Sequence, residues 1–185
     1  FYEILEELVE FGIARYKRNY SNRYQDTDLV LYQKYTYEDA CRLLSWENNE
    51  VPLNIGGYKY DKKTKTFPVF INYDKSENIQ DTIKYEDHFV NSNTLIAISK
   101  QSRTITSEDV QNFLHAPERG IQVELFVRKN KDDKISKEFY YLGHMKATGM
   151  VKEFVMPNTD KTAVEIEWAL DTPVREDIYQ YIVNG

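Results

Sequence analysis

The chain has 185 residues, of which 41% are hydrophobic and 14% aromatic, and this composition fits one domain with a sizeable core. No apolar run approaches the ~20 residues needed to cross a bilayer. The single cysteine, Cys41, has no partner for an internal disulfide or a zinc finger. These features argue against a membrane protein and favour the cytoplasm, while the net charge of −6 argues against a uniformly basic nucleic-acid binder.

Apolar residues at helical spacing predict helices at both ends of the chain and at two places between them. The first helix covers residues 1–20, and a short one covers residues 37–46. The third, over residues 107–116, opens on Ser107, a residue type that is typical of helix N-caps. Residues 175–183 predict the closing helix.

Strand-like composition covers most of the chain between these helices. Six segments are predicted as strands: 56–60, 67–73, 94–99, 121–129, 137–147 and 163–171. The first two flank the polar turn 61–66 and form a hairpin. Strands with few helices predict an α+β fold whose sheet is mostly antiparallel, curved or closed into a barrel, and flanked by helices.

The whole chain is expected to form one domain, residues 1–185. Within it we expect a helical part over residues 1–50, a β-rich core over 51–170 and a C-terminal helix over 171–185. The first residue is Phe1 and not methionine, so we interpret the domain as one excised from a longer polypeptide.

Two short basic segments interrupt the acidic chain. Residues 59–75 hold five lysines and two aspartates, and residues 128–137 hold five basic and two acidic residues. Each segment is therefore +3 (5 − 2), which leaves −12 for the rest of the chain (−6 − 6). We expect these loops to gather on one basic face, although lysine-rich loops can also be no more than soluble turns.

Catalytic and metal-binding patterns are absent from the sequence. His88, His115 and His144 lie in unrelated segments, so a structural role is predicted for each. There is no phosphate-binding glycine loop and no serine nucleophile elbow. We therefore expect a binding module with no catalytic residue, metal or cofactor of its own.

The strongest functional signal is "GGYKYD", residues 56–61. Consecutive glycines in a strand mark a close approach by a ligand or another backbone, or else a β-bulge. Tyr58 and Tyr73, on the two arms of the hairpin, are expected to sandwich a flat heterocycle, while Asp61 accepts a hydrogen bond from its exocyclic amine. The alternative for Asp61 is to cap the hairpin turn.

This segment resembles the GGYxxD segment of SRA domains, which flip 5-methylcytosine out of DNA into an aromatic pocket. The resemblance implies that Tyr58 is the first stacking ring, that Asp61 reads cytosine, and that Tyr73 or Phe70 is the second ring. The predicted base pocket consists of Tyr58, Asp61, Tyr73, Gly57, Phe70 and Asp74. The sequence departs from many SRA domains at "NYDK", residues 72–75, so the wall that would touch the methyl group, where Asp74 lies, differs.

A wider resemblance covers nearly the whole chain through "YTYEDACRLLSWENNEVPLNIGGY", "FPVFINYDK", "YEDHFVNSNTLIAISKQSR" and "ELFVRKNKDDKISKEFYYLGH". These segments are similar to the C-terminal target recognition domains of SauUSI-like type IV, modification-dependent restriction enzymes. The resemblance implies a parent chain whose nuclease and helicase domains use ATP and Mg²⁺ elsewhere, and it allows a homodimer of the parent. The partner of this domain would be double-stranded DNA with a modified cytosine. The alternative is a protein-interaction module that dimerises the parent without reading bases.

DNA contacts are expected outside the base pocket, where basic loops meet phosphates. The segment "SKQSR", residues 99–103, is expected to probe a groove or fill the vacated base stack, unless it is only a solvated loop that leads into the helix at Ser107. The predicted DNA-contacting residues are Lys62, Lys63, Lys65, Lys100, Ser102, Arg103, Arg128 and Lys129.

Overall fold

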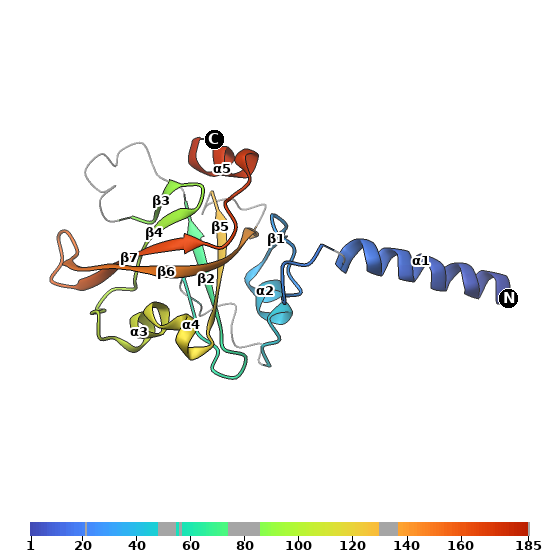
Figure 1. Ribbon diagram of the computed structural model, residues 1–185, viewed down its shortest axis with the longest axis horizontal. Helices are drawn as coiled ribbons and strands as arrows, with labels where there is room; N and C mark the ends of the chain where they lie inside the picture. Colours follow the sequence, from blue (N-terminus) through green and yellow to red (C-terminus); the bar gives the residue numbers. More distant parts are fainter. Residues whose placement is uncertain (21, 48–54, 56, 74–85, 130–136, 185) are drawn as a thin grey trace.

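A seven-stranded, mostly antiparallel sheet forms the centre of the computed structural model (Figure 1). The structure describes residues 1–20, 22–47, 55, 57–73, 86–129 and 137–184. The strands are β1 (Lys34–Tyr35), β2 (Thr66–Asn72), β3 (His88–Asn91), β4 (Thr94–Ile98), β5 (Gln122–Arg128), β6 (Phe139–Val155) and β7 (Thr162–Leu170). The helices are α1 (Tyr2–Tyr20), α2 (Tyr37–Leu43), α3 (Glu108–Leu114), α4 (Ala116–Arg119) and α5 (Glu176–Asn184).

The sheet has the order β2-β5-β6-β7-β4-β3, with β1 paired to β6. Every pairing is antiparallel except that of β2 with β5, which is parallel. Among the described residues no ladder joins β3 back to β2, so the sheet is open and not closed into a barrel. The predicted α+β class and the mostly antiparallel sheet are confirmed.

Strand β6 gives the sheet its bend. Its first part pairs with β5 and its second part with β7, and the register shifts in both ladders. Such irregularities bend a strand and increase its twist. Gly143 lies at one of these shifts with φ +95°, and a Cβ at that position would come within 3.1 Å of the Tyr24 ring. Glycine is therefore required there by both the backbone angle and the close approach.

Two apolar clusters cover the two faces of the sheet. One includes Phe67, Phe113 and Trp168 and extends to α5. The other includes Phe70 and Phe126 and extends to α2. Strand β2 contributes to both clusters because successive side chains of a strand point to opposite faces. This is why β2 is buried along nearly its whole length.

A buried acidic residue and a buried histidine link β5 to β6. Glu124 and His144 are register partners, with side chains 0% and 5% exposed, and Oε1 of the first lies 3.0 Å from Nδ1 of the second. The two atoms do not form an aligned hydrogen bond. The Tyr141 hydroxyl donates to the other oxygen, Oε2, at 2.5 Å. Burial raises the pKa of Tyr141, and the negative charge of Glu124 raises it further.

The predicted helices are present, with α3 and α4 dividing the third of them. Ser107 is the N-cap residue of α3, but its hydroxyl accepts a hydrogen bond from the Thr104 amide and does not cap the helix. Residues 57–60 are not a strand, and the hairpin is held by isolated bridges, Tyr58 to Val69 and Asp61 to Thr66. In the described part of the chain, no helix is both long and apolar enough to span a membrane.

Candidate functional site

A cleft of about 600 Å³ lies between the hairpin turn and the N-terminal end of α3. Its aromatic lining residues are Tyr58, Tyr60 and Phe67; the basic ones are Lys59, Lys62, Lys100 and Arg103; the acidic ones are Glu108 and Asp109; and the polar ones are Ser102, Ser107 and Asn112. Four cations face two anions, a balance of +2 (4 − 2). The volume is in the range of ordinary ligand pockets. The cleft is therefore suited to a flat ligand that carries negative charge nearby.

Tyr58 anchors the hairpin side of the cleft. Its bridge to Val69 turns the ring inward, where it packs edge-on against Phe67 and Phe113 at centroid distances of 5.6 and 5.0 Å. Its hydroxyl donates to Asp109 Oδ2 at 2.6 Å. Burial, together with this bond to a carboxylate, raises the pKa of Tyr58 well above its ordinary value. Tyr58 thus joins the core to the polar wall of the cleft.

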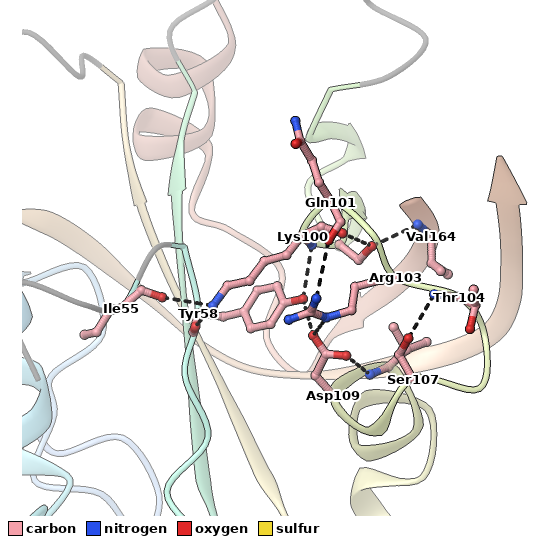
Figure 2. A network of polar contacts seen from close by, with 11 residues as sticks. Ile55, Tyr58, Lys100, Gln101, Arg103, Thr104, Ser107, Asp109 and Val164 are labelled. Carbon is pink, nitrogen blue, oxygen red and sulfur yellow. Dashed lines mark hydrogen bonds and ion pairs between the residues drawn. The ribbon is translucent and has the colours of Figure 1, made fainter. Parts of the chain in front are cut away.

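Lys100 covers the ring of Tyr58 (Figure 2). Its ammonium lies 4.6 Å from the ring centroid and donates to the Tyr58 carbonyl oxygen at 2.9 Å. Its backbone amide donates to the Tyr58 hydroxyl at 3.1 Å. Burial lowers the pKa of the Lys100 ammonium, and the nearby Arg103 lowers it further. The Lys100 ammonium contacts an aromatic ring and a carbonyl oxygen, and an anionic group such as a phosphate would bind it more strongly.

Asp109 and Arg103 form the opposite wall of the cleft. The Arg103 Nε donates to Asp109 Oδ2 at 2.8 Å, and Figure 2 shows both side chains converging on Tyr58. Burial would raise the pKa of the Asp109 carboxyl, but the bonds from Tyr58 and Arg103 hold it below its usual value. The carboxylate accepts three hydrogen bonds, including one from the Val110 amide, out of about four that it can accept. One acceptor direction is left for a ligand.

Asp61 caps the hairpin turn and does not line the cleft. Its Oδ2 accepts from the Thr64 amide at 3.1 Å and from the Thr64 hydroxyl at 2.6 Å. The turn-capping alternative is therefore the observed geometry, with Thr64 as the residue that Asp61 binds.

Gly57 has φ +93°, a backbone angle that favours glycine, and its carbonyl accepts from the Phe70 amide at 2.6 Å.

Replacing Asp61 by alanine is expected to lower stability by ~0.5–1.5 kcal/mol for each hydrogen bond that the turn loses, without changing DNA preference. Asp61→Asn, which keeps an acceptor, should lose less. Thermal melting and DNA binding should be measured on the same samples. A fully stable Asp61→Ala protein that no longer distinguishes methylated from unmethylated DNA would return this residue to the base-reading role.

The expected sandwich of Tyr58 with Tyr73 is not the observed arrangement. Tyr73 follows β2 at its far end, where its ring packs on Phe89 and its hydroxyl accepts from the Phe89 amide. Phe70 points to the other face of the sheet and stacks on Phe126. The alternation of side chains along β2 separates Phe70 from Tyr58. Asp74 lies outside the described residues.

The predicted basic residues divide between two ends of the sheet. Lys62 lies at the cleft, 4.0 Å from Glu108, and Lys63 forms an exposed ion pair with Glu47 that raises the pKa of the lysine. Ser102, with φ +59°, also lies at the cleft. Lys65 lines a second cavity, of about 370 Å³.

Arg128 and Lys129 lie away from the cleft. Arg128 contacts Asn72 and the Phe139 ring, and Lys129 donates to the Tyr181 carbonyl at 3.2 Å. The parallel β2–β5 pair separates the two groups because its seven paired residues, six steps of about 3.3 Å, span ~20 Å. Arg128 and Lys129 therefore do not share the cleft with Lys62, while residues 130–136 of the second basic segment lie outside the described residues, so the single basic face stays a prediction.

Seven residues of the cleft were not among the predicted site residues: Lys59, Tyr60, Phe67, Ser107, Glu108, Asp109 and Asn112. Tyr60 follows Tyr58 by two positions, so strand alternation would have placed both on one face. Asp109 is 51 residues from Tyr58, and no local pattern connects them. Within the described part of the chain, no cluster of histidine, cysteine and acidic residues is arranged to hold a metal ion.

Three solved structures share the SRA-like fold of this chain. The SUVH5 SRA domain in complex with hemimethylated CG DNA is 12% identical, with 80% of this chain and 92% of that chain covered and a TM-score of 0.50. The DNA modification-dependent restriction endonuclease AspBHI is 10% identical, with 82% of this chain and 80% of that chain covered and a TM-score of 0.52. Arabidopsis thaliana SUVH6 is 12% identical, with 80% of this chain and 27% of that chain covered and a TM-score of 0.51. At these identities the likeness concerns the fold.

Residues 29–182 match the family described as "Domain of unknown function (DUF3427)", and the chain belongs to this family. A comparison with curated protein sequences gave no match.

Proposed function

We propose that this domain binds double-stranded DNA containing 5-methylcytosine and holds the modified base, turned out of the helix, in the cleft beside Tyr58. The observation that carries the proposal is the cleft itself, which combines aromatic rings, a carboxylate and four cations on an SRA-like fold. Two proteins with this fold support the proposal, because one is bound to methylated DNA and the other is dependent on DNA modification. One is an SRA domain in complex with hemimethylated DNA, and the other is a modification-dependent restriction enzyme.

Base extrusion is favoured over contact with the methyl group in the DNA groove, because the methyl group alone contributes little binding free energy. A buried methyl group contributes only ~0.8 kcal/mol, which is about fourfold in affinity. A base held in a cleft is instead tested on its whole shape and on its hydrogen-bonding edge, at an unpairing cost of a few kcal/mol. Thymine carries the same methyl group but has an acceptor where cytosine has an amine. A carboxylate in the cleft therefore rejects thymine.

Asp109 is the carboxylate that we assign to the cytosine amine, since it lines the cleft and has one acceptor direction left. Arg103 and Lys100 are donors that match the acceptor atoms of cytosine. This assignment replaces Asp61, whose carboxylate is used by Thr64.

Stacking requires the ammonium of Lys100 to leave the Tyr58 ring, which it now covers. A cation–π contact is worth ~0.5–2 kcal/mol, and base stacking on an aromatic ring ~1–3 kcal/mol. A phosphate near the cleft gives the displaced ammonium a stronger partner than the carbonyl groups it holds now. Tyr60, which is half-buried on the same hairpin, provides a second ring that needs no displacement.

The parent enzyme belongs to the same proposal. We propose that the domain gives target specificity to a SauUSI-like, ATP-dependent type IV restriction endonuclease, whose nuclease and helicase domains carry the chemistry. In this scheme the domain is not catalytic, and ATP and Mg²⁺ act elsewhere in the parent chain. The domain works where that enzyme meets foreign DNA, in the cytoplasm.

The proposal is tested with fluorescent duplexes that are identical except at one position, which holds cytosine, 5-methylcytosine or thymine. The expected order of affinity is 5-methylcytosine first, with cytosine and thymine both weaker. Equal binding of all three duplexes at several salt concentrations would contradict base recognition. No binding to any duplex would favour a protein-interaction role.

Lysines at the cleft are expected to bind DNA phosphates. Replacing Lys59 and Lys62 by alanine should weaken methylated and unmethylated DNA alike and reduce the salt dependence by up to ~0.9 in log–log slope for each phosphate that is no longer neutralised. The matched control replaces Arg128 and Lys129, which lie at the other end of β2 and β5 and should have little effect. If the control pair reduces the slope as much as the cleft pair, the DNA path does not follow the cleft.

A further inference from the structure

Asn112 is a buried polar residue of the cleft that has no role among the base contacts proposed for Asp109, Arg103 and Lys100. It lies on α3 three positions after Asp109, and residues three apart on a helix are neighbours on one face. Both side chains line the cleft. Asn112 is only 8% exposed, and a polar side chain this deeply buried is stable only when its amide is hydrogen-bonded.

Arg119, on α4, fixes which end of the Asn112 amide it faces. The Arg119 Nη1 donates to Asn112 Oδ1 at 2.9 Å. A guanidinium has five donors and no acceptor, so the amide atom beside it must be the oxygen and not the nitrogen. The orientation of the amide therefore follows from the chemistry of its partner, and the nitrogen Nδ2 is directed away from Arg119.

The Asn112 Nδ2 is a donor that the described part of the chain leaves unused. It carries two hydrogens and has no hydrogen-bond partner among the described residues. The fully buried side-chain atoms without a partner are Glu124 Oε1 and His144 Nδ1, so Nδ2 is not sealed in the core. Since Asn112 lines the cleft, its small exposed part presents a neutral donor there.

The cationic donors of the cleft are already engaged. The Arg103 Nε donates to Asp109, and its Nη1 donates to the Gln101 carbonyl oxygen at 3.3 Å. The Lys100 ammonium donates to the Tyr58 carbonyl oxygen. A positive charge also binds phosphates regardless of sequence, so it discriminates poorly between bases. A neutral amide that is held in one orientation instead distinguishes an acceptor atom from a donor.

We propose that Asn112 is a specificity-determining residue, which donates from Nδ2 to N3 of the extruded cytosine while Asp109 accepts from the N4 amine. This inference rests on the proposed function. Cytosine presents a donor beside an acceptor on this edge, and the two residues present an acceptor beside a donor. Thymine has an O4 acceptor beside an N3–H donor and so meets a like group at both positions. Arg119 is a positioning residue, because it acts only through Asn112.

Asn112→Asp tests the proposal, because it keeps the size of the side chain and an oxygen for Arg119 but replaces the donor with an acceptor. Affinity of the 185-residue chain is measured for two duplexes that hold 5-methylcytosine or thymine at one position. The ratio of the two affinities is expected to fall about tenfold from that of the parent. The added negative charge weakens both duplexes and cancels in the ratio.

The result separates this inference from the proposed function. If the parent binds both duplexes equally, base recognition is wrong and the role of Asn112 falls with it. If the parent prefers methylcytosine and Asn112→Asp prefers it as strongly, only the role of Asn112 is overturned.

Asn72→Asp is the matched control. Asn72 also accepts from an arginine, Arg128, but it lies at the far end of β2, so the same exchange of amide for acid should leave the ratio unchanged. A fall in the ratio as large as that of Asn112→Asp would overturn the proposal, because the effect would then not come from the cleft.

The exposed residue Arg119 tests the same orientation without a change in the cleft itself. Arg119→Met frees the Asn112 amide to turn and should lower the ratio severalfold. Arg119→Lys keeps a partner that can only donate and should retain the parent's ratio. The melting temperature of each variant shows that the domain is folded. An unchanged ratio in a folded Arg119→Met protein would overturn the positioning role.

Discussion

Replacing Glu124 by alanine is expected to lower the free energy of unfolding by about 1–3 kcal/mol for each buried polar group that loses its partner. The side chain is fully buried between β5 and β6, where it faces His144 at 3.0 Å and accepts from the Tyr141 hydroxyl. Its removal leaves two buried polar groups without their partner in the middle of the sheet, and desolvated groups of this kind are costly. Urea denaturation measures the loss directly.

Two controls separate charge from packing at this position. Glu124→Gln keeps an acceptor for Tyr141 and should lose clearly less stability than Glu124→Ala. Glu165→Ala removes an acidic side chain that is only half-buried on β7. Its free energy of unfolding should lie within ~0.5 kcal/mol of that of the parent. Glu124→Ala with the parent's stability would show that β5 and β6 do not pair in the register described.

Replacing Asp109 by alanine is expected to abolish most of the preference for methylated DNA, a loss of ~1–3 kcal/mol in discrimination. The carboxylate holds the Tyr58 hydroxyl and the Arg103 guanidinium and has one acceptor direction left for the cytosine amine. Fluorescence anisotropy with matched methylated and unmethylated duplexes measures the change. Weak binding to unmethylated DNA should persist, because the cleft lysines remain.

The neighbouring residue provides a close control. Glu108→Ala removes an acidic residue from the same cleft, but that side chain is exposed and lies 4.0 Å from Lys62 alone. It should strengthen binding to all duplexes slightly and leave the preference unchanged. Tyr58→Phe removes the hydroxyl that Asp109 holds and keeps the ring. If Glu108→Ala and Asp109→Ala behave alike, the cleft acts through charge alone and Asp109 does not read the base.

Local sequence pattern was sufficient for most elements of this fold. Helical spacing identified α1 and α5, and the polar turn between two strand-like segments identified the hairpin, because both signals lie within about ten residues. Strand β1 has only two residues and β3 only four, too few for a periodic pattern. The parallel pairing of β2 with β5 joins segments that are far apart in the sequence, and nothing local specifies it.

The candidate site was predictable only in part, for the same reason. Tyr58, Lys100 and Arg103 were predicted and do meet at one cleft. The carboxylate that joins them, Asp109, comes from α3 and is brought in by the tertiary fold. Asp61 was the acidic residue nearest in sequence, but a short polar turn satisfies an aspartate locally, here through Thr64.

Weakening the base pair of the modified cytosine shows whether this base leaves the DNA helix when the domain binds. Affinity should be measured for two duplexes that differ in the base opposite the 5-methylcytosine, guanine in one and adenine in the other, with the same pair around unmodified cytosine as the reference. Because extrusion costs a few kcal/mol in total and least from a mispair, we expect roughly tenfold tighter binding of the mispaired methylcytosine, and a smaller gain in Tyr60→Ala. Equal or weaker binding of the mispaired duplex would contradict it, since a protein that reads the methyl group in the groove gains nothing from a loosened pair.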